Sequence, residues 1–175
     1  MRLEFEMKQP VNSDQINKSP SSQGATIYQI PLKAFPGFWA FGYFVQFEYY
    51  QVLIDTGSGY GDSNKHLSSG FQAISEISEM KTRLEDLTHI FITHGHIDHF
   101  GALPYVMKMS EGITFENIGM ELGPFQFHHV TSHCPGQVAI KFHNELFSGD
   151  HILSEISPHQ APERLVLNTG LRHYL

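Results

Sequence analysis

Four side chains able to bind a metal ion lie within six residues, in the segment His94-Gly95-His96-Ile97-Asp98-His99. The segment follows the apolar run HIFIT and precedes a predicted helix, so it forms a turn from strand to helix. Imidazole and carboxylate groups are ligands for zinc and iron. His94 and His96 point the same way if the turn is extended, and Asp98 and His99 then enter from the other side. This spacing favours two adjacent metal positions.

Two further candidate ligands occur later in the chain. His133 follows the predicted strand FQFHHV, and Asp150 follows the predicted strand NELFS. Strand ends hold polar side chains rigidly, which a metal site requires. Cys134 is adjacent to His133, but in an extended segment its side chain points away, so we expect a small buried residue there. His128 and His129 are interpreted as structural.

Four motifs, in order, resemble the metallo-β-lactamase superfamily. THGHIDHFGAL is similar to its H-x-H-x-D-H signature, LIDTG to its strand and turn before the first helix, and SHCPGQVAI and LFSGDHIL to its third and fourth motifs. The resemblance runs from about residue 26 to residue 175. Two longer segments resemble the bacterial hydrolase branch near glyoxalase II-like proteins: DLTHIFITHGHIDHFGALP and GDHILSEISPHQAPE.

The resemblance implies the fold, the ligands and the chemistry. The fold would be the α+β, four-layer αβ/βα sandwich of the superfamily. The metal ligands would be His94, His96 and His133 for the first metal, Asp98 and His99 for the second, and Asp150 between them. The cofactors would be two Zn²⁺ ions, with Fe or Mn as alternatives, holding a bridging hydroxide that attacks the substrate. Asp98 would also be catalytic, by orienting the hydroxide or moving a proton to the leaving group. Asp55 would support the ligands or the turn.

The implied function is hydrolysis of a small ester, thioester, lactone or amide. One departure of the chain from the family pattern concerns the second metal: a further histidine ligand for it, expected beyond Asp150, is not evident. The candidates are His151, His159 and His173. We therefore expect that the C-terminal part of the second half is missing from this chain. Two alternatives remain: a metal-binding fragment that is inactive without a partner or its C-terminal part, and an enzyme similar to the mononuclear-iron persulfide dioxygenases.

Composition narrows the function classes. The 175 residues carry 11 Lys and Arg against 18 Asp and Glu, which argues against a nucleic-acid groove. Histidine is abundant, with 12 residues, and the single cysteine excludes an intrachain disulfide. There is neither a signal peptide nor a membrane span in the sequence, so we expect a cytoplasmic protein that binds a small molecule and no membrane. An open sheet edge would allow it to form a homo-oligomer.

Periodicity and turn residues predict the order of the elements. Strands are expected at 26–32, 39–47, 50–54 and 89–93, and helices at 71–84 and 100–109. ITFENI, MELGPFQFHHV, GQVAIKF and ELFSGD predict four further short strands. Residues 1–25 are interpreted as a polar N-terminal segment or linker, and 26–175 as one metallo-β-lactamase-like domain. The polar stretch 8–26 would be the linker or a long surface loop.

Two other features have competing interpretations. The aromatic run around Phe38, Trp39 and Phe44 is more typical of a sheet core, although Phe38 and Trp39 beside Pro36-Gly37 would suit a flap over the metals. VLIDTGSG also resembles half of an aspartic protease site. That reading leaves the histidine cluster unexplained and lacks the second element that such a fold needs.

Overall fold

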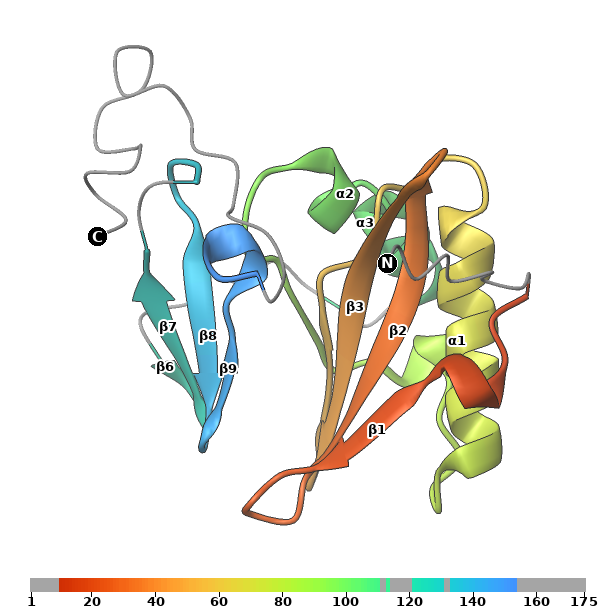
Figure 1. Cartoon of the computed structure of the whole chain (residues 1–175). Coiled ribbons are helices and arrows are strands. Elements are labelled where there is room, and N and C mark those ends of the chain that lie inside the picture. Colours follow the sequence, from red (N-terminus) through yellow and green to blue (C-terminus); the bar gives the residue numbers. More distant parts are fainter. Residues whose placement is uncertain (1–9, 111–112, 114–120, 131–132, 154–175) are drawn as a thin grey trace, which may run out of the picture.

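A computed structural model describes residues 10–110, 113, 121–130 and 133–153. It contains two β-sheets lying side by side (Figure 1). The first sheet has the order β1-β2-β3-β4-β5, and the second has the order β6-β7-β8-β9. The strands of the first are β1 (Asn17–Pro20), β2 (Thr26–Phe35), β3 (Phe38–Phe47), β4 (Tyr50–Ile54) and β5 (His89–Phe91). Those of the second are β6 (Glu121–Leu122), β7 (Phe125–His129), β8 (Val138–Phe142) and β9 (Glu145–Phe147).

The longest helix covers the outer face of the first sheet (Figure 1). This helix, α1 (Ser63–Ile77), connects β4 to β5, and these two strands are parallel because a helical crossover returns the chain to the same end of the sheet. All other strand pairs are antiparallel. The remaining helices are short: α2 (Ile97–Phe100), α3 (Leu103–Met109), and the 3₁₀ turns η1 (Ser13–Gln15), η2 (Leu84–Asp86) and η3 (Gly149–His151).

Two apolar cores lie on the two faces of the first sheet. One packs Phe44 and Leu53 against α1, and the other packs Val45 and Val52 against the second sheet. β3 and β4 are therefore buried on both faces, which explains why their sequences are apolar at consecutive positions. The aromatic run thus divides: Phe44 is fully buried, whereas Phe38 is 49% exposed.

The predicted strands at 39–47 and 50–54 are found, and β2 extends beyond the predicted 26–32. The helix predicted at 71–84 instead begins at Ser63, with Asp62 at the N-cap position. It ends at Ile77, because the backbone turns to an extended conformation at Ser78. The helix predicted at 100–109 is two helices. They separate near Gly101, where the chain packs on the turn after β4: a Cβ at Gly101 would lie 2.1 Å from the Ser58 carbonyl oxygen.

The described part of the N-terminal segment differs from a linker. Residues 17–20 form β1 and pair with β2, and Val11 and Ile16 are buried in the core under α1. All four residues of β1 are exposed, so a polar strand at the edge of the sheet has the composition of a loop. ITFENI lies almost entirely outside the described residues, and the other three segments of the second half form β6 and β7, β8, and β9.

The described residues thus form three successive layers: helices, the first sheet and the second sheet. They contain no helix on the outer face of the second sheet, which is where the fourth layer of the expected sandwich would lie. None of the helices in this part of the chain is long and apolar enough to span a membrane.

Candidate metal centre

The topology brings the candidate residues to one edge of the molecule. Ile54 of β4 pairs with Phe91 of the parallel β5, so both strands end at the same edge. Asp55 follows the first strand, and Thr93 and His94 follow the second. The second sheet joins at this point, because the Val138 N–H at the start of β8 donates to the Thr93 carbonyl at 2.8 Å.

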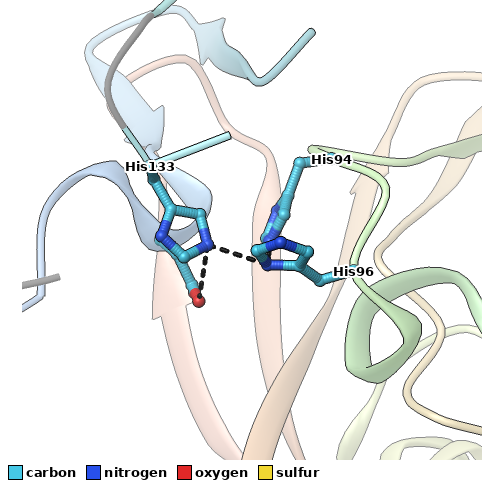
Figure 2. A group of neighbouring side chains, drawn as sticks. His94, His96 and His133 are labelled. Atoms are coloured by element: carbon cyan, nitrogen blue, oxygen red, sulfur yellow. Dashed lines mark hydrogen bonds and ion pairs between the residues drawn. The ribbon is translucent and has the colours of Figure 1, made fainter. Parts of the chain in front are cut away.

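Three histidines converge from two separate segments. Figure 2 shows the rings of His94, His96 and His133 pointing toward one another. His94 Nε2 lies 3.1 Å from His96 Nδ1, and His133 Nε2 lies 2.9 Å from the same nitrogen. Asp150 Oδ2 is 3.6 Å from His133 Nε2. These four side chains, the first donor group, each offer a ligand atom within 4.8 Å of the others.

A second donor group shares one member with the first. It consists of Asp98, His99 and Asp150. His99 Nε2 lies 3.4 Å from Asp150 Oδ1 and 3.6 Å from Asp98 Oδ2. Asp150 therefore directs one carboxylate oxygen toward each group.

The separations fit a bound metal. Ligand atoms about 2.0–2.1 Å from a tetrahedral metal are about 3.3 Å apart. The measured contacts between donor atoms, from 2.9 to 3.6 Å, lie on both sides of this value. Imidazole nitrogens and carboxylate oxygens are also a donor set that zinc, iron and manganese accept.

The protonation states of His94 and His96 suit metal binding. Burial, followed by the charge of His99, lowers the pKa of His94 to about 3. Burial and the neighbouring His133 also lower the pKa of His96. Both rings are therefore neutral at pH 7, and each has a lone pair to offer.

His99 and Asp150 behave in the opposite sense, as an ion pair. Burial alone would lower the pKa of His99, but its hydrogen bonds to Asp150 and Asp55, and their charges, raise it to about 10. Burial would raise the pKa of Asp150, but the hydrogen bond to His99 and the nearby histidines outweigh it and lower this pKa.

A buried hydrogen-bond network behind the donors fixes their orientation. The Asp55 carboxylate accepts hydrogen bonds from the Thr93 N–H and hydroxyl, both at 2.8 Å, and from His99 Nδ1 at 2.8 Å. The Thr93 oxygen lies 3.0 Å from His94 Nδ1 and accepts its proton while the hydroxyl donates to Asp55. This arrangement leaves Nε2 of both histidines facing the donor groups. The sequence analysis placed Asp55 behind the ligands but missed Thr93, whose only signal is its position at the end of the apolar run.

A close backbone contact positions Asp150. The preceding residue, Gly149, has a φ of +52°, and a Cβ there would lie 2.9 Å from the Thr93 hydroxyl oxygen. Only glycine adopts this conformation and this approach without strain. Thr93 therefore contacts both the Asp55 network and the turn that presents Asp150.

The comparison with known families agrees with this geometry. Residues 41–111 match the family model described as the metallo-beta-lactamase superfamily. This range includes Asp55 and the whole 94–99 segment. This part of the chain is therefore similar to the metallo-beta-lactamase superfamily.

Three solved structures resemble the chain over a larger range. A metallo-beta-lactamase family protein from Thermus thermophilus has a TM-score of 0.59 and 18% identity, over 75% of this chain and 61% of its own. A metallo-beta-lactamase from Pontibacter korlensis has a TM-score of 0.58 and 17% identity, over 91% of this chain and 81% of its own. A flavoprotein from Thermotoga maritima has a TM-score of 0.52 and 22% identity, over 81% of this chain and 44% of its own.

The predicted fold is thus confirmed as the metallo-beta-lactamase fold. The chain spans less than two thirds of the length of the Thermus and Thermotoga proteins.

The remaining candidates lie apart from the donor groups. Cys134 is buried, and burial raises the pKa of its thiol. Neither Cys134 nor His151 is among the converging donors of the described residues, and His128 and His129 are exposed. His159 and His173 lie outside the described residues. Because Asp55 is buried and bound to Thr93 and His99, it is unsuited to the shared water of an aspartic protease.

Proposed function

We propose that this protein is a metal-dependent hydrolase of the metallo-beta-lactamase superfamily that acts on a small ester, thioester, lactone or amide. The observation that carries the proposal is the shared position of Asp150, between two donor groups that contain every ligand expected from the sequence except the last histidine. A carboxylate common to two groups of donors is typical of sites that hold two adjacent metal ions.

In this proposal His94, His96 and His133 hold one metal, Asp98 and His99 hold the other, and Asp150 contacts both. When bound, the metals supply Lewis-acid chemistry, lowering the pKa of water and polarising a carbonyl group. Zinc suits these nitrogen and oxygen donors and has no redox chemistry that would compete with hydrolysis.

The protein's own groups would position water and move protons. The Asp98 side chain is 15% exposed and lies at the edge of the second donor group, 3.6 Å from His99 Nε2. From this position its carboxylate can orient a water molecule and pass a proton to a leaving group. Asp55 stays behind His99 and keeps its ring in the orientation that binding requires. The cytoplasmic location and the relationship to glyoxalase II-like proteins are part of the same proposal.

The first experiment is to measure metal content per chain by elemental mass spectrometry, on protein purified without chelator or added metal. The proposal expects about two zinc ions, and hydrolysis of at least one member of a panel of esters, thioesters, lactones and amides. Removing the metal should abolish this activity, and returning zinc should restore it. A fully metal-loaded protein that cleaves none of the panel would overturn the proposal.

Iron chemistry is the second candidate. The donors suit iron as well as zinc, and three of the similar structures are flavo di-iron protein mutants from Thermotoga maritima. One iron per chain, with oxygen consumption in the presence of a persulfide, would favour a dioxygenase-like enzyme. One metal or none, with no turnover, would favour an inactive fragment that needs a partner or further chain.

A further inference from the structure

An exposed phenylalanine lies beside the candidate metal centre. In the register of β3 and β4, Tyr43 pairs with Ile54, the last residue of β4. Phe41, two residues further along β3, therefore extends past the end of β4, to the edge where Asp55 and Thr93 lie. Its side chain is 45% exposed.

The face of β3 that carries Phe41 is the face toward the second sheet. Alternation along the strand places Phe41 on the same side as Tyr43 and Val45. Val45 is fully buried in the core between the sheets, and the Tyr43 ring lies 5.3 Å from the ring of Phe147 on β9. Phe147 is three residues before Asp150. Phe41 thus continues this apolar face outward, beyond the packed core, at the end of the molecule where Asp150 lies.

Two more exposed apolar side chains come from α2. Ile97 and Phe100, spaced i and i+3, share one side of this helix and are 49% and 36% exposed. They flank Asp98 and His99 in the sequence, and α2 packs beside β3. Figure 1 shows α2 and the β2–β3 turn at the same end of the first sheet. We call these three exposed side chains the apolar rim: Phe41, Ile97 and Phe100.

The segments that carry the donors have no basic side chain. Lysine and arginine are absent from β3, α2 and the described residues 55–62, 92–99, 133–138 and 148–153, and a basic residue near Phe41 in the sheet register is Lys33 of β2, which pairs with Trp39. An anionic group on a substrate would meet the carboxylates of Asp98 and Asp150. A neutral apolar group would instead bury its surface against the rim.

We propose that the apolar rim binds an uncharged apolar acyl group of the substrate, with Phe41 as the main contact. This inference rests on the proposed hydrolase function and names its substrate class. The value of kcat/KM should rise with the length of the substrate's acyl group, because each added methylene group is buried against the rim.

The test compares 4-nitrophenyl acetate, butanoate and hexanoate as substrates of the zinc-loaded protein, each rate corrected for its background hydrolysis. We expect kcat/KM to rise about twofold per added methylene, half of the roughly fourfold gain of complete burial. Anionic 4-nitrophenyl succinate should be a poorer substrate than the butanoate. Phe41→Ser should flatten the series, and Phe41→Leu should preserve it.

Tyr49→Ser is the matched control, because Tyr49 is an exposed aromatic residue beyond the opposite end of β3. It should leave the series unchanged. Thermal unfolding and metal content of each variant identify any loss that comes from misfolding.

A binding measurement separates this inference from the proposed function. Calorimetry should show that hexanohydroxamate binds the zinc-loaded protein about 15-fold more tightly than acetohydroxamate, and that Phe41→Ser reduces this ratio to near one. If no ester is cleaved but the ratio holds, the hydrolase function fails and the apolar rim stands. Equal binding of the two hydroxamates, or a series that Phe41→Ser leaves unaltered, would overturn the rim.

Discussion

The two sides of the candidate metal centre are built differently. On the side of the first sheet, His94 and His99 are nearly buried and are oriented by Thr93 and the Asp55 carboxylate. On the side of the second sheet, Asp150 is 25% exposed, and its carboxylate contacts His99 and His133, which are themselves donors. His94 and His99 are thus held by hydrogen bonds from behind, whereas Asp150 is held by other donors and by a glycine turn. We therefore expect the orientation of Asp150 to depend more on a bound metal than that of His94 and His99.

The largest effect should come from Asp150, where the two sides meet. Asp150→Ala removes the carboxylate common to both donor groups, so metal should be lost from both and hydrolysis should fall by more than about 100-fold. Elemental analysis and kcat/KM measure the two losses. Glu145→Ala, which removes a carboxylate from the preceding strand β9, is the control. Unchanged metal content in Asp150→Ala would contradict the bridging assignment.

A smaller loss is expected on the other side from Asp55→Asn. The amide retains the size of the side chain but not its charge, so His99 is less well oriented and less basic. Metal affinity should fall by about 10–100-fold, mainly at the second donor group. Stepwise zinc titration should show one weakened and one nearly normal site. Equal weakening of both sites would show that Asp55 supports the whole centre.

The need for glycine in the turn before Asp150 can be tested by substitution. Gly149→Ala places a Cβ against Thr93 in a left-handed conformation, and should reduce the free energy of unfolding by about 2–3 kcal/mol. Gly136→Ala separates the two causes, because its φ is +76° but its Cβ would meet no atom within 4 Å. It should lose only about 1 kcal/mol. Urea unfolding of both variants gives the difference, and equal losses would exclude the Thr93 contact as a cause.

The smallest effect concerns a histidine outside the centre. His66 is fully buried, its Nδ1 accepts a hydrogen bond from the Lys33 N–H, and its ring stacks on Trp39. Burial lowers its pKa, with smaller opposing and assisting effects of Asp62 and Lys33. Because the pKa of His66 is lower in the folded state than in the unfolded state, protonation of His66 favours unfolding. The contribution of His66 to stability is therefore complete above about pH 6.5 and is lost as the pH falls below this value.

His66→Asn should therefore reduce the pH dependence of unfolding between pH 7 and pH 5. Loss of the ring stacking should also lower stability at pH 7 by about 1 kcal/mol. Urea midpoints of the variant and the unaltered protein at both pH values test this. Parallel pH profiles would contradict it.

The sequence predicted which side chains converge better than it predicted the elements that carry them. His94 to His99, His133 and Asp150 follow apolar runs, and a strand end is readable from periodicity. The early start of α1 was missed, because Ser63 and Asn64 suit a turn as well as a first helical turn. β1 was missed because an exposed edge strand has no alternation. Thr93 was not identified, since its role depends on a contact with Asp55 from 38 residues away.

The convergence of His94 and His133 from different sheets has a consequence for regulation. A metal held by both residues would connect the two sheets, much as a covalent cross-link would, and only the folded chain offers the complete set of donors. Folding stability would then follow the supply of free metal, gaining about 1.4 kcal/mol for each tenfold rise in its concentration above the dissociation constant. The cell's metal balance would thereby set both the activity and the lifetime of this protein.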